Sequence, residues 1–246
     1  MSLRRTLAAL ALLAGCAATS APASAACRQA LALALDVSGS VDREEYALQL
    51  NGLAGALETP EVRAALLAMP ETPVAIAVFE WSGPDFQRLL ADWTVIDGEA
   101  ALSGLVARLR AVRRTGSDPS TAIGAAMRHG VALLDKAPGC WRRTLDISGD
   151  GEHNSGPHPR EVKKTLPPDL TINGLTIGAR GESSTDGIGA LVGYYTAYVI
   201  HGPDAFVETA LGFRAYEAAM VRKLKRELES VVVGLARPPV PEPAGR

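Results

Sequence analysis

The chain has 246 residues, of which 47% are hydrophobic and 21% are charged, and its formal net charge is −2. This mildly acidic balance, without a basic stripe, argues against nucleic-acid binding, which needs clustered lysines and arginines. The densest basic run, residues 221–229, has helical spacing and is interpreted as a solvated helix face. No apolar stretch is long enough to cross a bilayer, so we expect no transmembrane segment.

The amino-terminal stretch has the three-part layout of a secretory signal peptide. Arg4 and Arg5 precede a short apolar run, and the small residues ASA at 23–25 suit cleavage, so residues 1–26 are assigned to the leader. The sequence LAGC at 13–16 also resembles a bacterial lipobox, in which Cys16 would carry a lipid. We therefore expect a periplasmic or secreted protein, or alternatively one anchored by lipid to the envelope. The leader contains two arginines and no acid, so its removal changes the charge from −2 to −4.

The first half of the mature chain alternates between strand and helix patterns. Residues 30–37 form a continuous apolar run, which is typical of a central parallel strand buried on both faces. Residues 40–57 predict an amphipathic helix that begins near Ser40 or Asp42, and residues 60–69 predict a further short helix. Two more strands are predicted over residues 72–82 and 88–96. The turn-like sequence GPDF joins them, which indicates an antiparallel hairpin.

The second half continues the alternation. Helices are predicted over 98–112 and 121–137, followed by a fourth strand over 142–148 and a polar loop rich in glycine and proline. After this loop we predict a short helix over 160–166, opened by Pro159, and a fifth strand over 170–178. A helix over 188–200, a sixth, edge strand over 204–210 and a long closing helix over 212–232 complete the order.

This order predicts an α/β fold of the doubly wound, Rossmann-like type. The central sheet is expected to be mostly parallel, with helices on both faces and one antiparallel edge strand. Residues 27–235 fit one domain with a sizeable core, and the proline-rich residues 236–246 are expected to form a disordered tail.

Three loops of the predicted fold carry oxygen-bearing side chains. In an open parallel sheet the loops after the strands gather at the carboxyl edge, where ligands bind. The first loop carries Asp36, Ser38 and Ser40 at alternate positions, the second places Thr121 at a helix start, and the third places Asp150 after a strand. Two carboxylates and three hydroxyls are hard oxygen donors, which suit Mg²⁺, Mn²⁺ or Ca²⁺ better than zinc.

The pattern D-x-S-x-S, then a threonine leading a helix, then Asp-Gly after a strand resembles the metal-ion-dependent adhesion site of von Willebrand factor A-like domains. The likeness covers nearly the whole mature chain. Finer similarity, in CRQALALALDVSGSVD, EWSG, TAIGAAM, LDISGDGEHN, INGLTIG and GPDAFV, is to a secreted bacterial branch of that family known only as a domain of unknown function.

The resemblance implies what the site does. It implies that Asp36, Ser38, Ser40, Thr121 and Asp150 hold a divalent cation, directly or through water, with Mg²⁺ as the first candidate. It also implies a vacant coordination position that a partner protein fills with an acidic side chain. The chain is thus expected to be a non-catalytic, metal-dependent, adhesion-type binding module.

Several residues depart from this pattern or compete with it. The second loop reads GSDPST, where the family usually has glycines; Pro119 should stiffen it and Asp118 would add an outer acid. Asp146 lies within a strand and is interpreted as a buried, hydrogen-bonded acid rather than a ligand. His153 and His158 flank the third loop, and we interpret them as solvated side chains rather than zinc ligands.

Cys27 and Cys140 remain once the leader is removed, an even pair in an oxidising compartment. In the strand order of the resembled family the first and fourth strands are neighbours, and each cysteine precedes one of them. The resemblance therefore implies a structural disulfide at the amino edge. It would close a loop of about 113 residues and contribute about 4–5 kcal/mol in the chain-entropy model.

Two other functions stay open at this point. A Mg²⁺-dependent hydrolase or phosphatase would use Asp36 as nucleophile, but such chemistry usually needs a second acid two residues on, where this chain has Ser38. The chain also contains neither a G-x-S-x-G motif nor a phosphate-binding G-x-x-x-x-G-K motif. Alternatively, the metal would only staple the three loops together, in a purely structural module.

Overall fold

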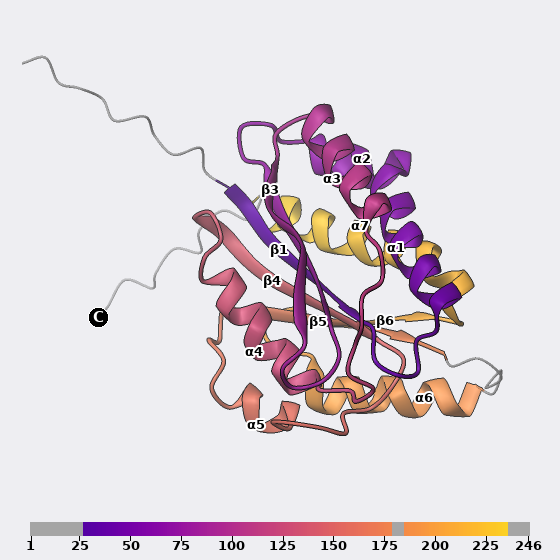
Figure 1. Ribbon diagram of the computed structural model, residues 1–246. Helices are drawn as coiled ribbons and strands as arrows, with labels where there is room; N and C mark the ends of the chain where they lie inside the picture. Colours follow the sequence, from indigo (N-terminus) through magenta and orange to yellow (C-terminus); the bar gives the residue numbers. More distant parts are fainter. Residues whose placement is uncertain (1–26, 179–184, 236–246) are drawn as a thin grey trace, which may run out of the picture.

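A six-stranded sheet forms the centre of the computed structural model, which describes residues 27–178 and 185–235 (Figure 1). The strand order is β3-β2-β1-β4-β5-β6. All neighbours are parallel except β2 and β3, which form the expected antiparallel edge. The strands are β1 (Cys27–Asp36), β2 (Val74–Trp81), β3 (Gln87–Ile96), β4 (Cys140–Gly149), β5 (Thr171–Ile177) and β6 (Val207–Ala210). The predicted leader and tail lie outside the described residues.

Strand β1 is the central strand because its alternating sequence fits two different helix layers. Its leucines at 31, 33 and 35 pack into one hydrophobic core and its alanines at 30, 32 and 34 into the other. Every residue of the strand is buried. Successive side chains of a strand point to opposite faces, so the larger leucines fill one side while the small alanines let helices approach on the other.

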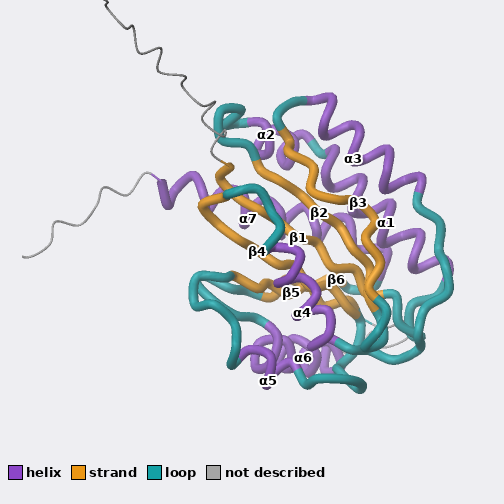
Figure 2. The backbone as a smooth tube through the Cα atoms, turned by 60° about the vertical axis from the view of Figure 1, so that its left-hand side comes forward, coloured by secondary structure: helices purple, strands orange, loops and turns teal. Residues whose placement is uncertain are grey.

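Two layers of helices enclose the sheet (Figures 1 and 2). Helices α1, α2, α3 and α7 contribute to the leucine-side core, and α4, α5 and α6 contribute to the alanine-side core. The helices are α1 (Arg43–Glu58), α2 (Pro60–Leu67), α3 (Glu99–Ala111), α4 (Ile123–Leu134), α5 (Pro159–Lys163), α6 (Thr185–Tyr194) and α7 (Tyr216–Leu235). This is the doubly wound α/β arrangement that the alternating sequence predicts.

A disulfide joins Cys27 and Cys140, the first residues of β1 and β4. The two residues are also partners in the parallel register, with their Cα atoms 4.3 Å apart. Both strands therefore begin earlier than the predicted bounds of 30 and 142, and the cysteines lie inside the strands rather than before them. The bond closes the amino edge of the sheet, opposite the loops that carry Asp36 and Asp150.

Two predicted elements in the second half differ from the structure. The helix expected over 188–200 is α6 followed by a π-helical turn, η1 (Tyr195–Val199). The closing helix expected from Gly212 begins instead with a 3₁₀ turn, η2 (Phe213–Ala215), before α7. Gly212 has a φ of +88°, outside the helical range, so the helix cannot start there.

Helix α7 carries a buried charge cluster, which corrects the prediction that residues 221–229 form a solvated face. Lys223 and Glu227 are buried, whereas Arg222, Arg226 and Glu229 of the same run are exposed. The Lys223 ammonium pairs with both Asp146 of β4 and Glu227. Asp146 is thus a buried, paired acid, as its place in the strand indicated. A charge on α7 can be buried because the sheet supplies its partner.

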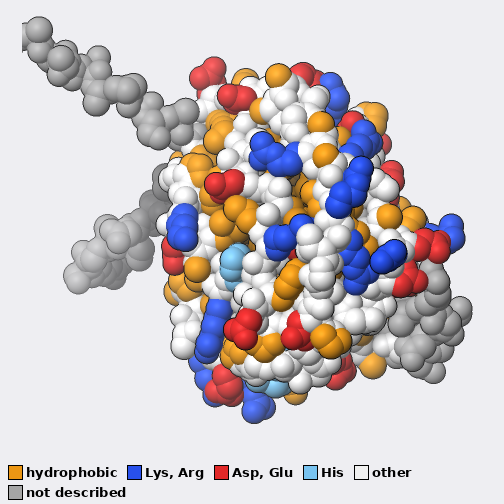
Figure 3. All heavy atoms as spheres, viewed as in Figure 1, with side chains coloured by type: hydrophobic (Ala, Val, Ile, Leu, Met, Phe, Trp, Pro, Cys, Tyr) orange, Lys and Arg blue, Asp and Glu red, His pale blue; other side chains and the backbone are white. Residues whose placement is uncertain are grey.

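The surface does not separate charges by sign on the face shown in Figure 3, where lysines and arginines are interspersed with acids. Among the described residues, no helix is long and apolar enough to cross a membrane.

Candidate metal centre

The loop after β1 holds its oxygens in a fixed order. Asp36 ends the strand, and its Oδ1 accepts a hydrogen bond from the backbone N–H of Ser38 at 2.8 Å. The hydroxyls of Ser38 and Ser40 lie 3.2 Å apart. Helix α1 then begins with a capping box between Asp42 and Glu45, which fixes the direction in which the chain leaves the loop.

Hydrogen bonds join the three predicted ligand loops in pairs. The Ser40 hydroxyl donates to Asp150 Oδ1 at 2.6 Å, which joins the first loop to the third. The Gly39 N–H donates to the Pro119 carbonyl at 3.0 Å, which joins the first loop to the second. The structure thus brings these loops together at one edge of the sheet, as parallel-strand topology predicts.

The second and third loops are joined by Asn154, a residue that the sequence reasoning did not single out. Its Oδ1 accepts from the Thr121 N–H at 2.8 Å, and its own N–H donates to the Thr121 carbonyl at 2.9 Å. Ser82, at the end of β2, adds support because its carbonyl accepts from the N–H of Ala122 at 2.7 Å. These bonds hold the backbone on both sides of Thr121 and do not use its hydroxyl, which could therefore contact an ion.

Burial increases from the rim of the site toward its floor. Asp36 and Ser38 are fully buried, Thr121 is nearly so, and Ser40 is exposed. A β-carbon added to Gly151, next to Asp150, would lie 4.0 Å from the Thr121 hydroxyl. The five predicted ligand residues therefore extend from the sheet edge to the solvent, so that a bound ion would be open on one side.

Two buried oxygens at the floor have no hydrogen-bond partner among the described residues: Asp36 Oδ2 and the hydroxyl of Tyr195. Both lie beside Gly149, where an added β-carbon would come within 2.8 Å of Asp36 Oδ2 and 2.6 Å of the Tyr195 oxygen. Unpaired buried polar atoms cost free energy unless something outside the protein satisfies them. An ion or a water would do so here.

The same burial changes the protonation of both acids. Burial is the main cause that raises the pKa of Asp36 to about 8, and the charge of Asp150 adds to it, against the hydrogen bonds from Ser38. Burial also raises the pKa of Asp150, and Glu45 raises it further, while the bond from Ser40 lowers it. Without a cation these carboxyls hold protons more tightly than exposed acids do.

These features fit a hard divalent cation. A cation would satisfy Asp36 Oδ2, replace the proton that the site otherwise retains, and find only carboxylate and hydroxyl oxygens around it. Within the described residues no group of three or more His, Cys, Asp or Glu is placed to hold a metal ion, so the candidate centre combines two acids with hydroxyl oxygens. The five ligand assignments themselves remain predictions.

Neighbouring polar residues have other roles. Asp118 Oδ1 accepts from both the N–H and the hydroxyl of Ser120, so this loop acid stabilises its own turn. The rings of His153 and His158 lie 5.2 Å apart, and His158 also packs edge-on against Tyr198. The π-helical turn that positions Tyr195 has no clear signal in the sequence, although such turns often occur at functional sites.

Comparison with known proteins identifies solved structures that have a similar fold. No curated protein matches the chain. Proximal thread matrix protein 1 from the mussel byssus is 14% identical with a TM-score of 0.56, over 83% of this chain and 47% of that one. The open conformation of the pilus adhesin SpaC from Lactobacillus rhamnosus GG is 12% identical with a TM-score of 0.58, over 83% of this chain and 30% of that one.

A von Willebrand factor type A structure from Catenulispora acidiphila is 13% identical with a TM-score of 0.55, over 83% of this chain and 43% of that one. This chain therefore spans less than half the length of each of these three proteins. At these identities the likeness establishes the fold, which is that of a von Willebrand A-type domain. The family model described as "Protein of unknown function (DUF1194)" matches residues 26–232, and the chain belongs to that family.

Proposed function

We propose that this protein is an extracytoplasmic, adhesion-type module that binds a partner protein through a divalent cation. Asp36, Ser38, Ser40, Thr121 and Asp150 would hold the cation, directly or through water. The observation that carries the proposal is the buried, unpartnered Asp36 Oδ2 at the floor of three hydrogen-bonded loops. A cation there would lower the free energy of an arrangement that otherwise buries unpaired oxygen.

The hydroxyl ligands give the cation its proposed role. Two carboxylates neutralise Mg²⁺, whereas three neutral hydroxyls add no further charge, so the ion stays attractive to another anion. A carboxylate from a partner would then complete its coordination at the exposed, Ser40 side. Mg²⁺ is the first candidate, with Mn²⁺ and Ca²⁺ as alternatives, because all three prefer oxygen ligands.

Two comparisons support this proposal. A second structure of the mussel byssus protein, 13% identical to this chain, has a zinc-occupied MIDAS motif, the metal-ion-dependent adhesion site, and SpaC is a pilus adhesin. The disulfide at the amino edge fits an oxidising compartment outside the cytoplasm, as does the predicted leader. Lipid attachment through Cys16 stays a prediction.

The first experiment is calorimetric titration of the chelator-stripped chain with Mg²⁺, Mn²⁺ and Ca²⁺. Saturable binding is expected, and Ser38→Ala and Asp150→Ala should weaken or abolish it. Asp85→Asn is the matched control, because Asp85 is an exposed acid in the loop after β2 and should leave binding unchanged. No binding at millimolar metal would overturn the proposal.

A carboxylate competition experiment separates binding from a purely structural role. With the preferred metal bound, a blocked aspartyl peptide should bind, and the matched asparaginyl peptide should not. If metal raises thermal stability but neither peptide ever binds, the metal would only join the loops.

A further inference from the structure

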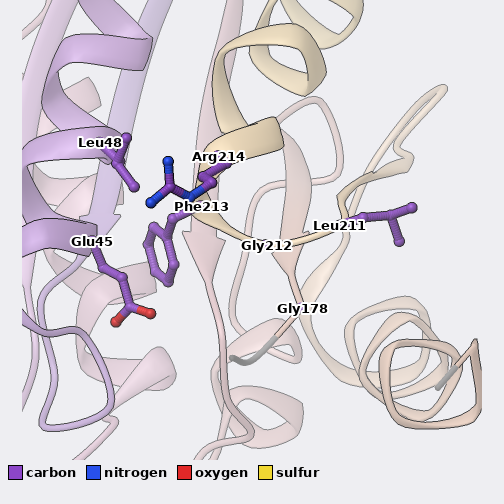
Figure 4. A pocket seen from close by; sticks show the side chains of 7 residues that line it. All are labelled: Glu45, Leu48, Gly178, Leu211, Gly212, Phe213 and Arg214. Carbon is purple, nitrogen blue, oxygen red and sulfur yellow. The ribbon is translucent and has the colours of Figure 1, made fainter. Parts of the chain in front are cut away.

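A pocket lies beside the candidate metal centre, between the first turns of α1 and the segment that links β6 to α7 (Figure 4). Its volume is about 150 Å³, and its lining residues are Glu45, Leu48, Gly178, Leu211, Gly212, Phe213 and Arg214. A cavity of roughly this size accommodates a group as large as benzene. It is therefore large enough for one medium-sized side chain.

The two sides of the pocket differ in character. Leu48 and Phe213 provide an apolar side next to α1, and Figure 4 shows the Phe213 ring beside Glu45. Gly178 and Gly212 line the opposite side with backbone alone, because glycine has no side chain. The N–H groups of both glycines donate to the Ala210 carbonyl at 2.9 Å. A guest side chain would thus pack on an aromatic ring and an aliphatic chain, over a wall without side chains.

The rim carries an unusual exposed leucine. Leu211 is 78% exposed, the most exposed large hydrophobic side chain among the described residues, and it points away from Phe213 toward solvent (Figure 4). Arg214 lies at the same rim and pairs with Glu44 of α1 at 2.9 Å. The rim of the pocket thus presents an apolar side chain at Leu211 and a cationic one at Arg214.

The pocket adjoins a second hollow that reaches Asp150 of the proposed metal centre. Glu45 lines the pocket and also acts electrostatically on Asp150. Gly178 lines the pocket and also a second hollow, of about 180 Å³, whose wall includes Asp150 and Gly151. A segment whose acid reached the cation would therefore pass close to this pocket.

We propose that the pocket receives an apolar side chain, about the size of leucine, from the same partner segment that gives its carboxylate to the cation. This inference rests on the proposed function. The Leu48 and Phe213 walls favour an apolar guest, and the Glu45 carboxylate disfavours an acidic one. The partner motif is thus an acid with an apolar residue nearby, rather than an acid alone.

The test uses a library of nine-residue peptides with a fixed central aspartate and randomised flanks, selected either on the chain loaded with Mg²⁺ or on the metal-free chain in EDTA. We expect Mg²⁺-dependent retention, with apolar residues enriched about tenfold or more at one flanking position. Leu48→Trp, which fills the pocket, and Leu211→Asp, which makes its rim acidic, should remove this enrichment while the aspartate is still retained.

The control is Leu89→Asp, because Leu89 is another exposed leucine, on β3, and this change should leave the enrichment intact. Calorimetry should show unchanged metal binding in all three variants, so that loss of apolar selection is assigned to the pocket. Mg²⁺-dependent retention without apolar enrichment, or with basic residues enriched instead, would overturn this inference alone. Equal retention in Mg²⁺ and EDTA would overturn both this inference and the proposed function.

Discussion

The described part of the fold contains two pairs of neighbouring acids, and only one pair has a cationic side chain beside it. Asp146 and Glu227, under α7, share the ammonium of Lys223. Asp36 and Asp150, at the carboxyl edge, have hydroxyl and N–H donors but no ion pair among the described residues. The protein itself supplies a cation to the first pair, whereas under the proposed function a cation from solution would pair with the second. Buried acids without a cation are costly, so the difference indicates which pair has a function.

The largest expected effect comes from removing the internal cation. Lys223→Met should lower the free energy of unfolding by about 3–5 kcal/mol, because it removes the ammonium that pairs with the buried side chains of Asp146 and Glu227. Urea unfolding measures the change. Lys225→Met, two residues away on the same helix, should have little effect. A small change in Lys223→Met would show that water already reaches the cluster, and the comparison between the two acid pairs would fail.

The carboxyl-edge pair should respond with the opposite sign. In metal-free buffer at neutral pH, Asp36→Asn should raise the free energy of unfolding by about 1–2 kcal/mol, since it removes a buried acid without a cation. In Mg²⁺ at 100 times the measured dissociation constant, the native chain should gain about 2.7 kcal/mol and the variant nothing. Denaturant melts with and without Mg²⁺ test this, and equal gains in both proteins would contradict the proposed site.

The internal cluster should also impose a pH dependence. Burial, followed by the charge of Glu227, raises the pKa of Asp146 well above its usual value despite Lys223. The unfolded chain releases this proton near pH 4 while the folded chain retains it, so this contribution to stability is lost as the pH rises above about 4. The slope is at most about 1.4 kcal/mol per pH unit.

Unfolding free energies between pH 4 and 7 should therefore decline more steeply in the native chain than in Asp146→Asn. Asp135→Asn, an exposed acid paired with Arg143, is the control and should retain the native slope. Parallel curves for the native chain and Asp146→Asn would mean that Asp146 is ionised throughout.

The smallest effect is expected at Tyr195. Tyr195→Phe removes an unpartnered buried hydroxyl near Asp36, so the stability of the metal-free chain should change by less than about 0.5 kcal/mol. If the hydroxyl supports a metal-bound water or Asp36 itself, Mg²⁺ affinity should fall about tenfold, as for other outer-shell partners. Calorimetry checks the affinity, and an unchanged dissociation constant would remove Tyr195 from the site.

The sequence was sufficient for the fold because the signals for the sheet are local and repeated. The continuous apolar run of β1, the turn-like sequence between β2 and β3, and the oxygen-bearing residues of each loop could each be identified within a short window. These patterns predicted a doubly wound α/β sheet and which loops meet at the carboxyl edge, and the resemblance of the loop motifs to a known family implied the von Willebrand A-type architecture.

What could not be predicted depends on contacts between distant segments. Asn154 joins two loops only when the fold brings it to Thr121, and Tyr195 reaches Asp36 only because a π-helical turn redirects it. The helical spacing of the basic run predicts a solvated Lys223, whereas its partner Asp146 lies 77 positions earlier, on β4. A short stretch of sequence gives no information on contacts between residues so far apart.

The disulfide determines how the domain would carry a mechanical load. If the described region were pulled from its two ends, force would enter at Cys27 and pass directly through the bond to Cys140, bypassing the residues between them. With a separation of 113 residues and about 3.5 Å per residue, roughly 400 Å of chain could not be extended while the bond is intact. The loops that carry Asp36 and Thr121 lie in this shielded part, whereas Asp150 lies in the loaded part. Pulling would therefore act on the candidate centre from the Asp150 side, and reduction of the disulfide would change how the domain resists load before it changes what the domain binds.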